Sequence, residues 1–120
     1  MRIETMMSDQ ITRYLDLAAD ETKITATNMA NVDTPGFRAM DFDFEAEMRQ
    51  AMFGIEEGIE PGKPRLRPEA NLITRPDGNN VSMDREGLHL AEAQLKYKTG
   101  ITLLKGEYQM EMDAIHADSK

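Results

Sequence analysis

The stretch Asn28-Met29-Ala30-Asn31-Val32-Asp33-Thr34-Pro35-Gly36-Phe37 lies where a helical pattern of apolar residues ends. Thr34 precedes a proline, which disfavours the helical backbone conformation at that residue. Pro35 and Gly36 suit the two central positions of a type II turn, because proline presets φ and glycine accepts a positive φ. Asn31 tolerates the left-handed conformation found at helix ends. Because the stretch contains no reactive group, we expect it to set the angle between two segments.

Before this stretch, apolar or small residues recur every three or four positions from about Ser8 to Asn31. This spacing predicts one amphipathic helix. The stripe changes from Leu and Ile to Ala and Thr along its length, and small residues let a partner helix approach closely, with less buried area. The expected seam includes Ile11, Tyr14, Leu15 and Ala18.

A second and more regular stripe runs from Asp84, the expected N-cap, to about His116. Its heptad-like spacing predicts a long helix that packs along another helix in coiled-coil fashion. Gly100 and Gly106 each lower helix propensity by about 1 kcal/mol relative to alanine, so this helix should depend on contacts with other helices. The stripe comprises Leu90, Gln94, Tyr97, Ile101, Leu104, Tyr108, Glu111 and Ile115.

The segment between the two helices holds all five prolines. Residues 61–68 contain three of them and cannot be helical, since each proline lacks a donor and clashes with the preceding turn. A short helix is expected from Phe44 to Phe53, ended by Gly54 and Gly58. Residues 72–74 and 79–81 are predicted to form a hairpin across the turn Pro76-Asp77-Gly78.

These patterns divide the chain into an N-terminal helix (1–33), an irregular or β middle segment (34–82) and a C-terminal helix (83–120). At 120 residues the three parts form one domain. The predicted fold class is mainly α: two long antiparallel helices paired in coiled-coil fashion, with an irregular, partly β middle.

Composition limits the functions that this chain can have. Its 14 basic and 22 acidic residues give a net charge of −8 that is spread evenly, which argues against nucleic acid or anionic membranes as partners. The absence of cysteine excludes disulfides, thiol catalysis and thiolate metal sites. Ten methionines supply much of the apolar volume, and methionine specifies packing poorly. We therefore expect apolar faces that neighbouring molecules complete.

No targeting or membrane segment is expected. No apolar run follows Arg2 as a cleavable secretory signal would require, and no stretch approaches the roughly 20 apolar residues of a membrane helix. The chain is therefore not expected to be an integral membrane protein, and composition alone indicates the cytoplasm.

Two patterns resemble metal sites, and both are incomplete. His89 and Glu92 have the spacing of ligands on a helix, but a di-metal bundle needs matching partners, and His116 lies far away in the sequence. We expect two surface histidines and no metal.

Residues 41–45 imitate the start of a calcium loop, which then fails at Ala46 and Met52. They are expected to form an extended edge with Phe42 and Phe44 on one side. No activated nucleophile or phosphate-binding loop accompanies these patterns, so neither an enzyme nor a cofactor is expected.

The stretch Asn28–Phe37 resembles the N-terminal signature of bacterial flagellar rod and hook proteins. Residues 77–86, continued by Leu90–Tyr97, are similar to the C-terminal half of proximal rod subunits of the basal body, the FlgB type. The resemblance covers the two terminal thirds of the chain and leaves residues 46–70 unmatched. The assembly and turn motif consists of Asn28, Asn31, Asp33, Thr34, Pro35, Gly36 and Phe37.

The resemblance implies a structural subunit that assembles with copies of itself and other rod proteins into a torque-transmitting shaft. It also implies contacts with the ring-to-rod adaptor and the export apparatus, and export by the flagellar type III system without a cleaved signal. The location would then be the periplasm-spanning rod. A soluble helical chaperone or adaptor for exported subunits is the alternative. The sequence leaves open whether the helical stripes form an internal core or contact neighbours.

Overall fold

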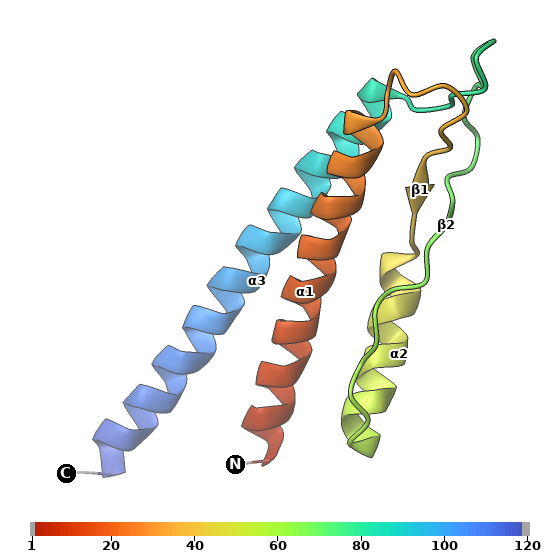
Figure 1. Ribbon diagram of the computed structural model, residues 1–120. Helices are drawn as coiled ribbons and strands as arrows, with labels where there is room; N and C mark the ends of the chain where they lie inside the picture. The colour runs from red at the N-terminus through yellow and green to blue at the C-terminus, as the bar shows by residue number, and fades with distance from the viewer. Residues whose placement is uncertain (1, 119–120) are drawn as a thin grey trace.

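The computed structural model describes residues 2–118 and consists of an elongated helical pair with an irregular cap. The long N-terminal and C-terminal helices run antiparallel. The shorter helix between them in sequence lies on the side of the N-terminal helix that faces away from the C-terminal one (Figure 1). The molecule measures 70 × 27 × 18 Å. The predicted fold class is confirmed. The elements are α1 (Arg2–Ala30), β1 (Met40–Asp41), α2 (Phe44–Glu57), β2 (Arg67–Pro68) and α3 (Met83–Asp118).

The seam between α1 and α3 is built from small and polar residues. On α3 the buried positions recur every seven residues, the spacing of a coiled-coil seam. Leu15 of α1 packs directly on one of them, Gly100: an added Cβ there would lie 2.6 Å from Leu15 Cδ2. The helices thus approach too closely for a large side chain at that point. The buried residues of α3 are Glu86, Ala93, Gly100 and Glu107.

The buried positions correct part of the predicted stripe of α3. Gln94, Ile101 and Tyr108 each follow a buried position by one residue, which turns them by about 100° around the helix. Because the seam is lined by small side chains, the large apolar ones lie beside it. Tyr108 is therefore 56% exposed.

The start of α3 also differs from the prediction, because Ser82 and not Asp84 caps it. The Arg85 N–H donates to Ser82 Oγ at 3.3 Å, and the Glu86 N–H donates to the Ser82 carbonyl at 2.9 Å. The helix thus begins one residue earlier than Asp84, at Met83.

Helix α2 is longer than predicted and runs through Gly54. Asp43 caps its start by accepting a hydrogen bond from the Ala46 N–H at 3.0 Å, so residues 41–45 are not extended throughout. Gly54 is buried and its carbonyl accepts from the Ile59 N–H at 2.7 Å, which stabilises the last turn. The helix ends at Glu57, and Gly58, which caps it, has a φ of +74°.

Phe44, the first residue of α2, contacts side chains of both long helices. Its ring meets that of Tyr14 edge to face, with centroids 5.4 Å apart, and stacks on Phe42 at 6.2 Å. Lys96 Nζ of α3 lies 4.0 Å from the centre of the Phe44 ring and 3.1 Å from Glu21 Oε2 of α1. One aromatic side chain therefore fixes α2 against both long helices.

The two-stranded sheet forms at a different place from the predicted hairpin. β1 pairs antiparallel with β2, Met40 opposite Pro68 and Asp41 opposite Arg67. Residues 76–78 form the expected turn, which the Arg75 N–H closes by donating to the Asn79 carbonyl at 2.8 Å, but residues 72–74 and 79–81 form no strands. The reason is competition: the Asn80 N–H donates to the Phe37 carbonyl instead of extending the hairpin.

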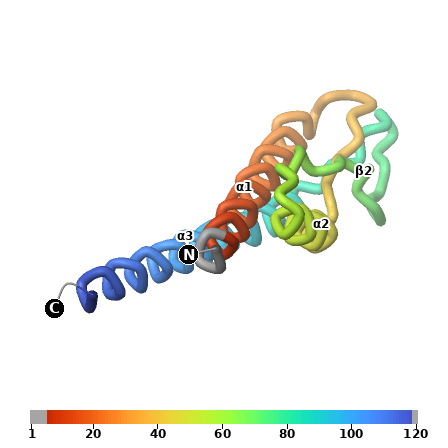
Figure 2. Tube along the Cα trace, turned by 90° about the horizontal axis from the view of Figure 1, so that it is seen from below, coloured from red at the N-terminus to blue at the C-terminus, as the bar shows by residue number. Residues whose placement is uncertain are grey.

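The C-terminal part of α3 extends beyond the rest of the molecule (Figure 2). From Tyr108 to Asp118 every residue except the half-buried Glu111 is exposed. Within residues 2–118, no helix has both the length and the apolar character that a membrane crossing requires.

Candidate functional site

The turn at residues 34–37 has the predicted geometry. Gly36 has a φ of +77°, and the Phe37 N–H donates to the Thr34 carbonyl at 3.2 Å. Pro35 and Gly36 thus occupy the central positions of a type II turn. Gly36 also packs against a second turn, since an added Cβ at Gly78 would lie 3.3 Å from Gly36 Cα. The two loops at this end of the molecule therefore contact each other backbone to backbone.

Asn28 connects α1 to both the loop and α3. Its Nδ2 donates to the Met40 carbonyl at 2.8 Å and to Glu86 Oε2 at 3.2 Å, while its Oδ1 accepts from the Met40 N–H at 3.1 Å. The buried Asn28 side chain bonds to both the N–H and the C=O of Met40, as a neighbouring β-strand would. This residue fixes where the chain returns after the turn.

Asn79 and Asn80 also connect the two loops to α1 at this junction, whereas the sequence predicted them only as part of a hairpin strand. Asn79 is fully buried and its Nδ2 donates to the carbonyls of Asn31 and Thr34, both at 2.8 Å. Asn80 Oδ1 accepts from the Ala39 N–H at 2.7 Å. The available signal was a pair of asparagines directly after a turn, where short amides commonly bond to backbone.

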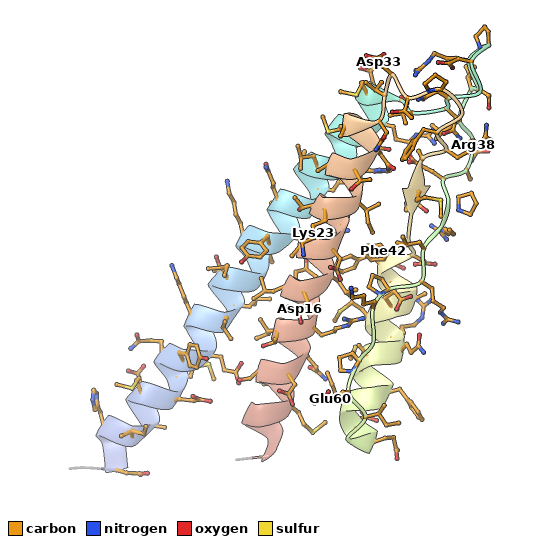
Figure 3. All side chains as sticks on the ribbon, viewed as in Figure 1. Asp16, Lys23, Asp33, Arg38, Phe42 and Glu60 are labelled. Atoms are coloured by element: carbon orange, nitrogen blue, oxygen red, sulfur yellow. The ribbon has the colours of Figure 1, made fainter. Side chains whose placement is uncertain are left out.

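Other residues of the motif lie at the surface of the junction. Asn31 does not adopt the left-handed conformation that we expected; among the described residues outside glycine, Asn71 alone has a positive φ. The Asn31 side chain instead donates to the Thr27 carbonyl and accepts from the Thr34 hydroxyl. Asp33 points outward at the end of the loop (Figure 3), and Pro35 is exposed.

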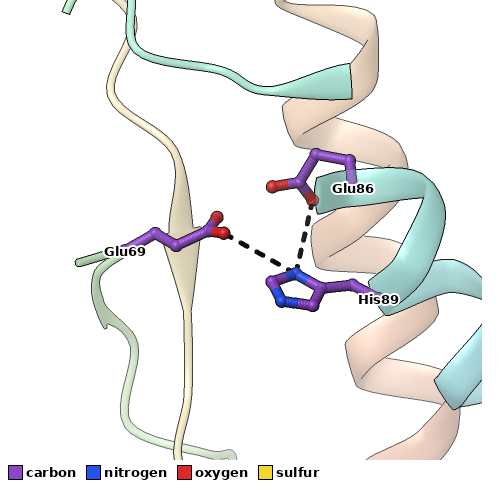
Figure 4. Close-up of side chains that lie close together, drawn as sticks. All are labelled: Glu69, Glu86 and His89. Atoms are coloured by element: carbon purple, nitrogen blue, oxygen red, sulfur yellow. Dashed lines mark ion pairs between the residues drawn. The ribbon is translucent and has the colours of Figure 1, made fainter. Parts of the chain in front are cut away.

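A cluster of two glutamates and a histidine lies beside the junction. His89 Nδ1 is 3.8 Å from Glu69 Oε1 and 3.9 Å from Glu86 Oε2 (Figure 4). Burial is the main cause that raises the pKa of Glu69 to about 8, and the nearby charges of Glu86 and Asp41 raise it further. The sequence paired His89 with Glu92, because Glu69 is distant in the chain and no pattern connects it to α3.

The predicted seam residues divide into three groups. In the first, Ala18 is fully buried, Leu15 packs on Gly100, and Tyr14 contacts Phe44. A half-buried set comprises Ile11, Leu90, Ile101 and Leu104. The exposed set comprises Tyr97, Tyr108 and Ile115.

The exposed set belongs to a larger group of exposed apolar residues on α3, which we call together the outer face of α3. They form two strips on opposite sides of the helix: Leu88, Leu95, Leu103 and Met110 on one, and Tyr97, Tyr108, Met112 and Ile115 on the other. Next to Tyr97 a groove of about 680 Å³ runs between α1 and α3, lined also by Ala19, Thr22 and Gln94. Exposed apolar strips of this kind are typical of sites of interaction with other proteins.

Together, the fold and these surfaces define an elongated helical subunit that leaves many large apolar side chains of α3 exposed. Comparison with curated proteins gives the family. No family model matches the chain. It is 35% identical to the flagellar basal body rod protein FlgB of Salmonella typhimurium, covering 84% of this chain and 86% of that protein. The FlgB proteins of Yersinia enterocolitica and Escherichia coli K12 are 33% and 30% identical, covering 84% and 86% of this chain and 87% and 88% of theirs.

The chain belongs to the FlgB family of flagellar basal body rod proteins, and its role is that of a structural rod subunit. The resemblance seen at residues 28–37 and 77–97 is thereby confirmed. As a component of the basal body, it interacts with other flagellar proteins.

Proposed function

We propose that this protein assembles with copies of itself and with other rod subunits to form the proximal rod, and that the outer face of α3 is the main contact. The observation that carries this proposal is the placement of large apolar residues outside the intramolecular seam. Burying one such side chain against a neighbouring subunit stabilises the assembly by about 1.5–3 kcal/mol, and the isolated chain lacks this stabilisation. The proposal thus accounts for the free end of α3.

The asparagine junction has a mechanical role in this proposal. It connects α1, the loop and α3 through Asn28, Asn79 and Asn80, with a glycine turn on either side. A junction that is hydrogen-bonded in this way resists bending, so the middle segment leaves the helical pair at a fixed angle. Torque would then pass along the helices without reorienting α2.

Helical stacking of identical subunits implies contacts between different patches of adjacent molecules. The groove beside Tyr97 offers a place on one subunit for a helix of the next. The ring-to-rod adaptor and the export apparatus are the further partners in this proposal. The chain would reach the periplasm through the flagellar type III apparatus without a cleaved signal, and it would have no catalytic activity.

A deletion strain tests this proposal. Loss of the gene should remove the rod and hook while the membrane ring persists, and expression of the chain in trans should restore both. A strain that builds normal rods without this protein would contradict the proposal. Retention of the protein in the cytoplasm of a wild-type strain, bound to other exported subunits, would favour the chaperone alternative.

A further inference from the structure

Three potential ligands meet where β2 passes the first turns of α3. Glu69 follows β2, whereas Glu86 and His89 lie one turn apart on α3. Both carboxylates are directed toward the imidazole (Figure 4). One donor atom from each residue lies within 4.8 Å of the other two. Within residues 2–118 this is the only such group of three.

The two carboxylates lack compensation for their burial. Glu86 is fully buried, and the side chain of Glu69 is 2% exposed. Both oxygens of Glu69 and Oε1 of Glu86 have no hydrogen-bond partner among the described residues. The one nearby arginine, Arg85, has its Nε 3.8 Å from Glu69 Oε1 and donates its terminal nitrogens to the carbonyls of Ala70 and Asn71. Metal binding requires both carboxylates to be ionised, and one guanidinium does not balance two buried negative charges, so a bound cation would be stabilised here.

We propose that Glu69, Glu86 and His89 bind one divalent transition-metal ion such as Zn²⁺, each through one donor atom. A mixed set of carboxylate and imidazole donors suits Zn²⁺ and similar ions, whereas Ca²⁺ and Mg²⁺ prefer oxygen alone. Donor atoms of a tetrahedral zinc site are about 3.4 Å apart, because the bonds are about 2.1 Å long. His89 Nδ1 is 3.8 and 3.9 Å from the two carboxylate oxygens, and all three donor atoms lie within 4.8 Å of one another, so the side chains would move closer together on binding.

The surroundings supply orientation and access. Asn28 Nδ2 donates to Glu86 Oε2, which leaves Oε1 without a partner. Outer hydrogen bonds of this kind hold a ligand in position and raise metal affinity. His89 also lines a cavity of about 160 Å³ together with Glu92 and Lys96, which gives an ion a route from solvent. The site would connect β2 to α3 beside the asparagine junction, whatever the role of the chain in a rod.

Calorimetric titration of the chelator-treated full chain with ZnCl₂ tests the proposal. We expect saturation at one equivalent, and Co²⁺ at the same site should show the visible absorption of a four-coordinate ion. The variants Glu69→Gln, Glu86→Gln and His89→Gln should each weaken Zn²⁺ binding about tenfold or more, by comparison with the effect of losing even an outer ligand partner. His116→Gln, which alters the second histidine of α3, is the matched control and should bind as the native chain does.

Circular dichroism shows whether each variant is folded. Glu69→Gln removes a buried charge and keeps the side-chain shape, so it should retain the fold even if a histidine variant does not. Absence of saturable binding by the folded native chain would overturn the proposal. So would unchanged binding by folded Glu69→Gln, or loss of binding in His116→Gln alone.

Discussion

Leu15 of α1 lies against the backbone of α3 at Gly100, so closely that an added Cβ would approach Leu15 Cγ to 3.0 Å and Tyr14 Cδ1 to 3.2 Å. At this contact a side chain of one long helix packs directly on the backbone of the other. It gives the glycine a packing role in addition to its cost in helix propensity.

Gly100→Val should destabilise the chain by about 1–3 kcal/mol, because the added side chain overpacks the seam. Gly106 offers the control, since it is exposed and an added Cβ there meets nothing within 4 Å. Gly106→Ala should raise stability by about 1 kcal/mol through helix propensity alone. Chemical unfolding monitored by circular dichroism measures both. If both variants changed the free energy of unfolding in the same direction and by the same amount, the seam would not lie where the structure places it.

Asn28→Ala should lower the free energy of unfolding by about 2–3 kcal/mol, because it leaves the half-buried N–H and C=O of Met40 without these partners. Asn31→Ala, at a half-buried position on the same motif, should cost less than half as much. Urea denaturation compares the two variants directly. If Asn31→Ala proved the more damaging, the junction would not be centred on Asn28.

Gly36→Val should impair motility, since a β-branched residue resists the φ of +77° and strain of this kind costs at least about 1–2 kcal/mol. Nothing lies within 4 Å of an added Cβ at Gly36, so the effect would come from the backbone alone. Gly62→Val is the control, because that position also has open space but no positive φ. Swimming in soft agar is the readout. Normal swimming by the Gly36 variant would show that the turn geometry is dispensable.

In metal-free buffer, Glu69 should make stability fall as the pH rises. Its pKa is raised from an ordinary value of 4.5 to about 8, with Glu86, Asp41, Arg85 and His89 as the charged or titratable groups around it. The folded chain therefore binds more protons than the unfolded chain between these values. The stabilisation that comes from the proton on Glu69 is complete below pH 4.5 and is lost as the pH approaches 8.

Glu69→Gln removes this titration, so thermal unfolding midpoints of native and variant chains should diverge with rising pH across that window. The variant should be the more stable of the two near pH 8. Parallel midpoints for the two chains from pH 4.5 to 8 would contradict the raised pKa.

The sequence predicted those features that local patterns encode. The two long helices follow from apolar periodicity, and the turn follows from Pro35 and Gly36. It did not predict contacts between distant segments. The asparagine junction needs Asn28 and Asn79, which lie far apart in the sequence, and nothing local marks them as a pair. The same holds for Glu69, which reaches His89 only because β2 passes α3.

The sequence left open whether the apolar stripe of α3 forms an internal seam or contacts neighbours. The structure places the small residues Ala93 and Gly100 in the intramolecular seam and leaves Tyr97 and Tyr108 exposed. Close approach of two backbones favours small residues. The periodic large apolar residues of α3 therefore mark the surface beside the seam. Tyr97, Tyr108 and Ile115 are the clearest members of that surface.

The central claim is that the outer face of α3 contacts other subunits, and one pair of variants tests it most directly. Tyr108 belongs to that face, whereas its exposed neighbour Gln109 is polar and bonds to Asp113 at 3.0 Å. Tyr108→Asp and Gln109→Asp introduce the same charge one residue apart, and neither should disturb the fold of the isolated chain.

The decisive measurement is the fraction of basal bodies that carry a rod, counted by electron microscopy in deletion strains expressing each variant. Tyr108→Asp should reduce that fraction about tenfold or more, since burying an unpaired charge in an interface costs several kcal/mol. Gln109→Asp should leave it unchanged. Normal rods built from the Tyr108→Asp chain would contradict the account.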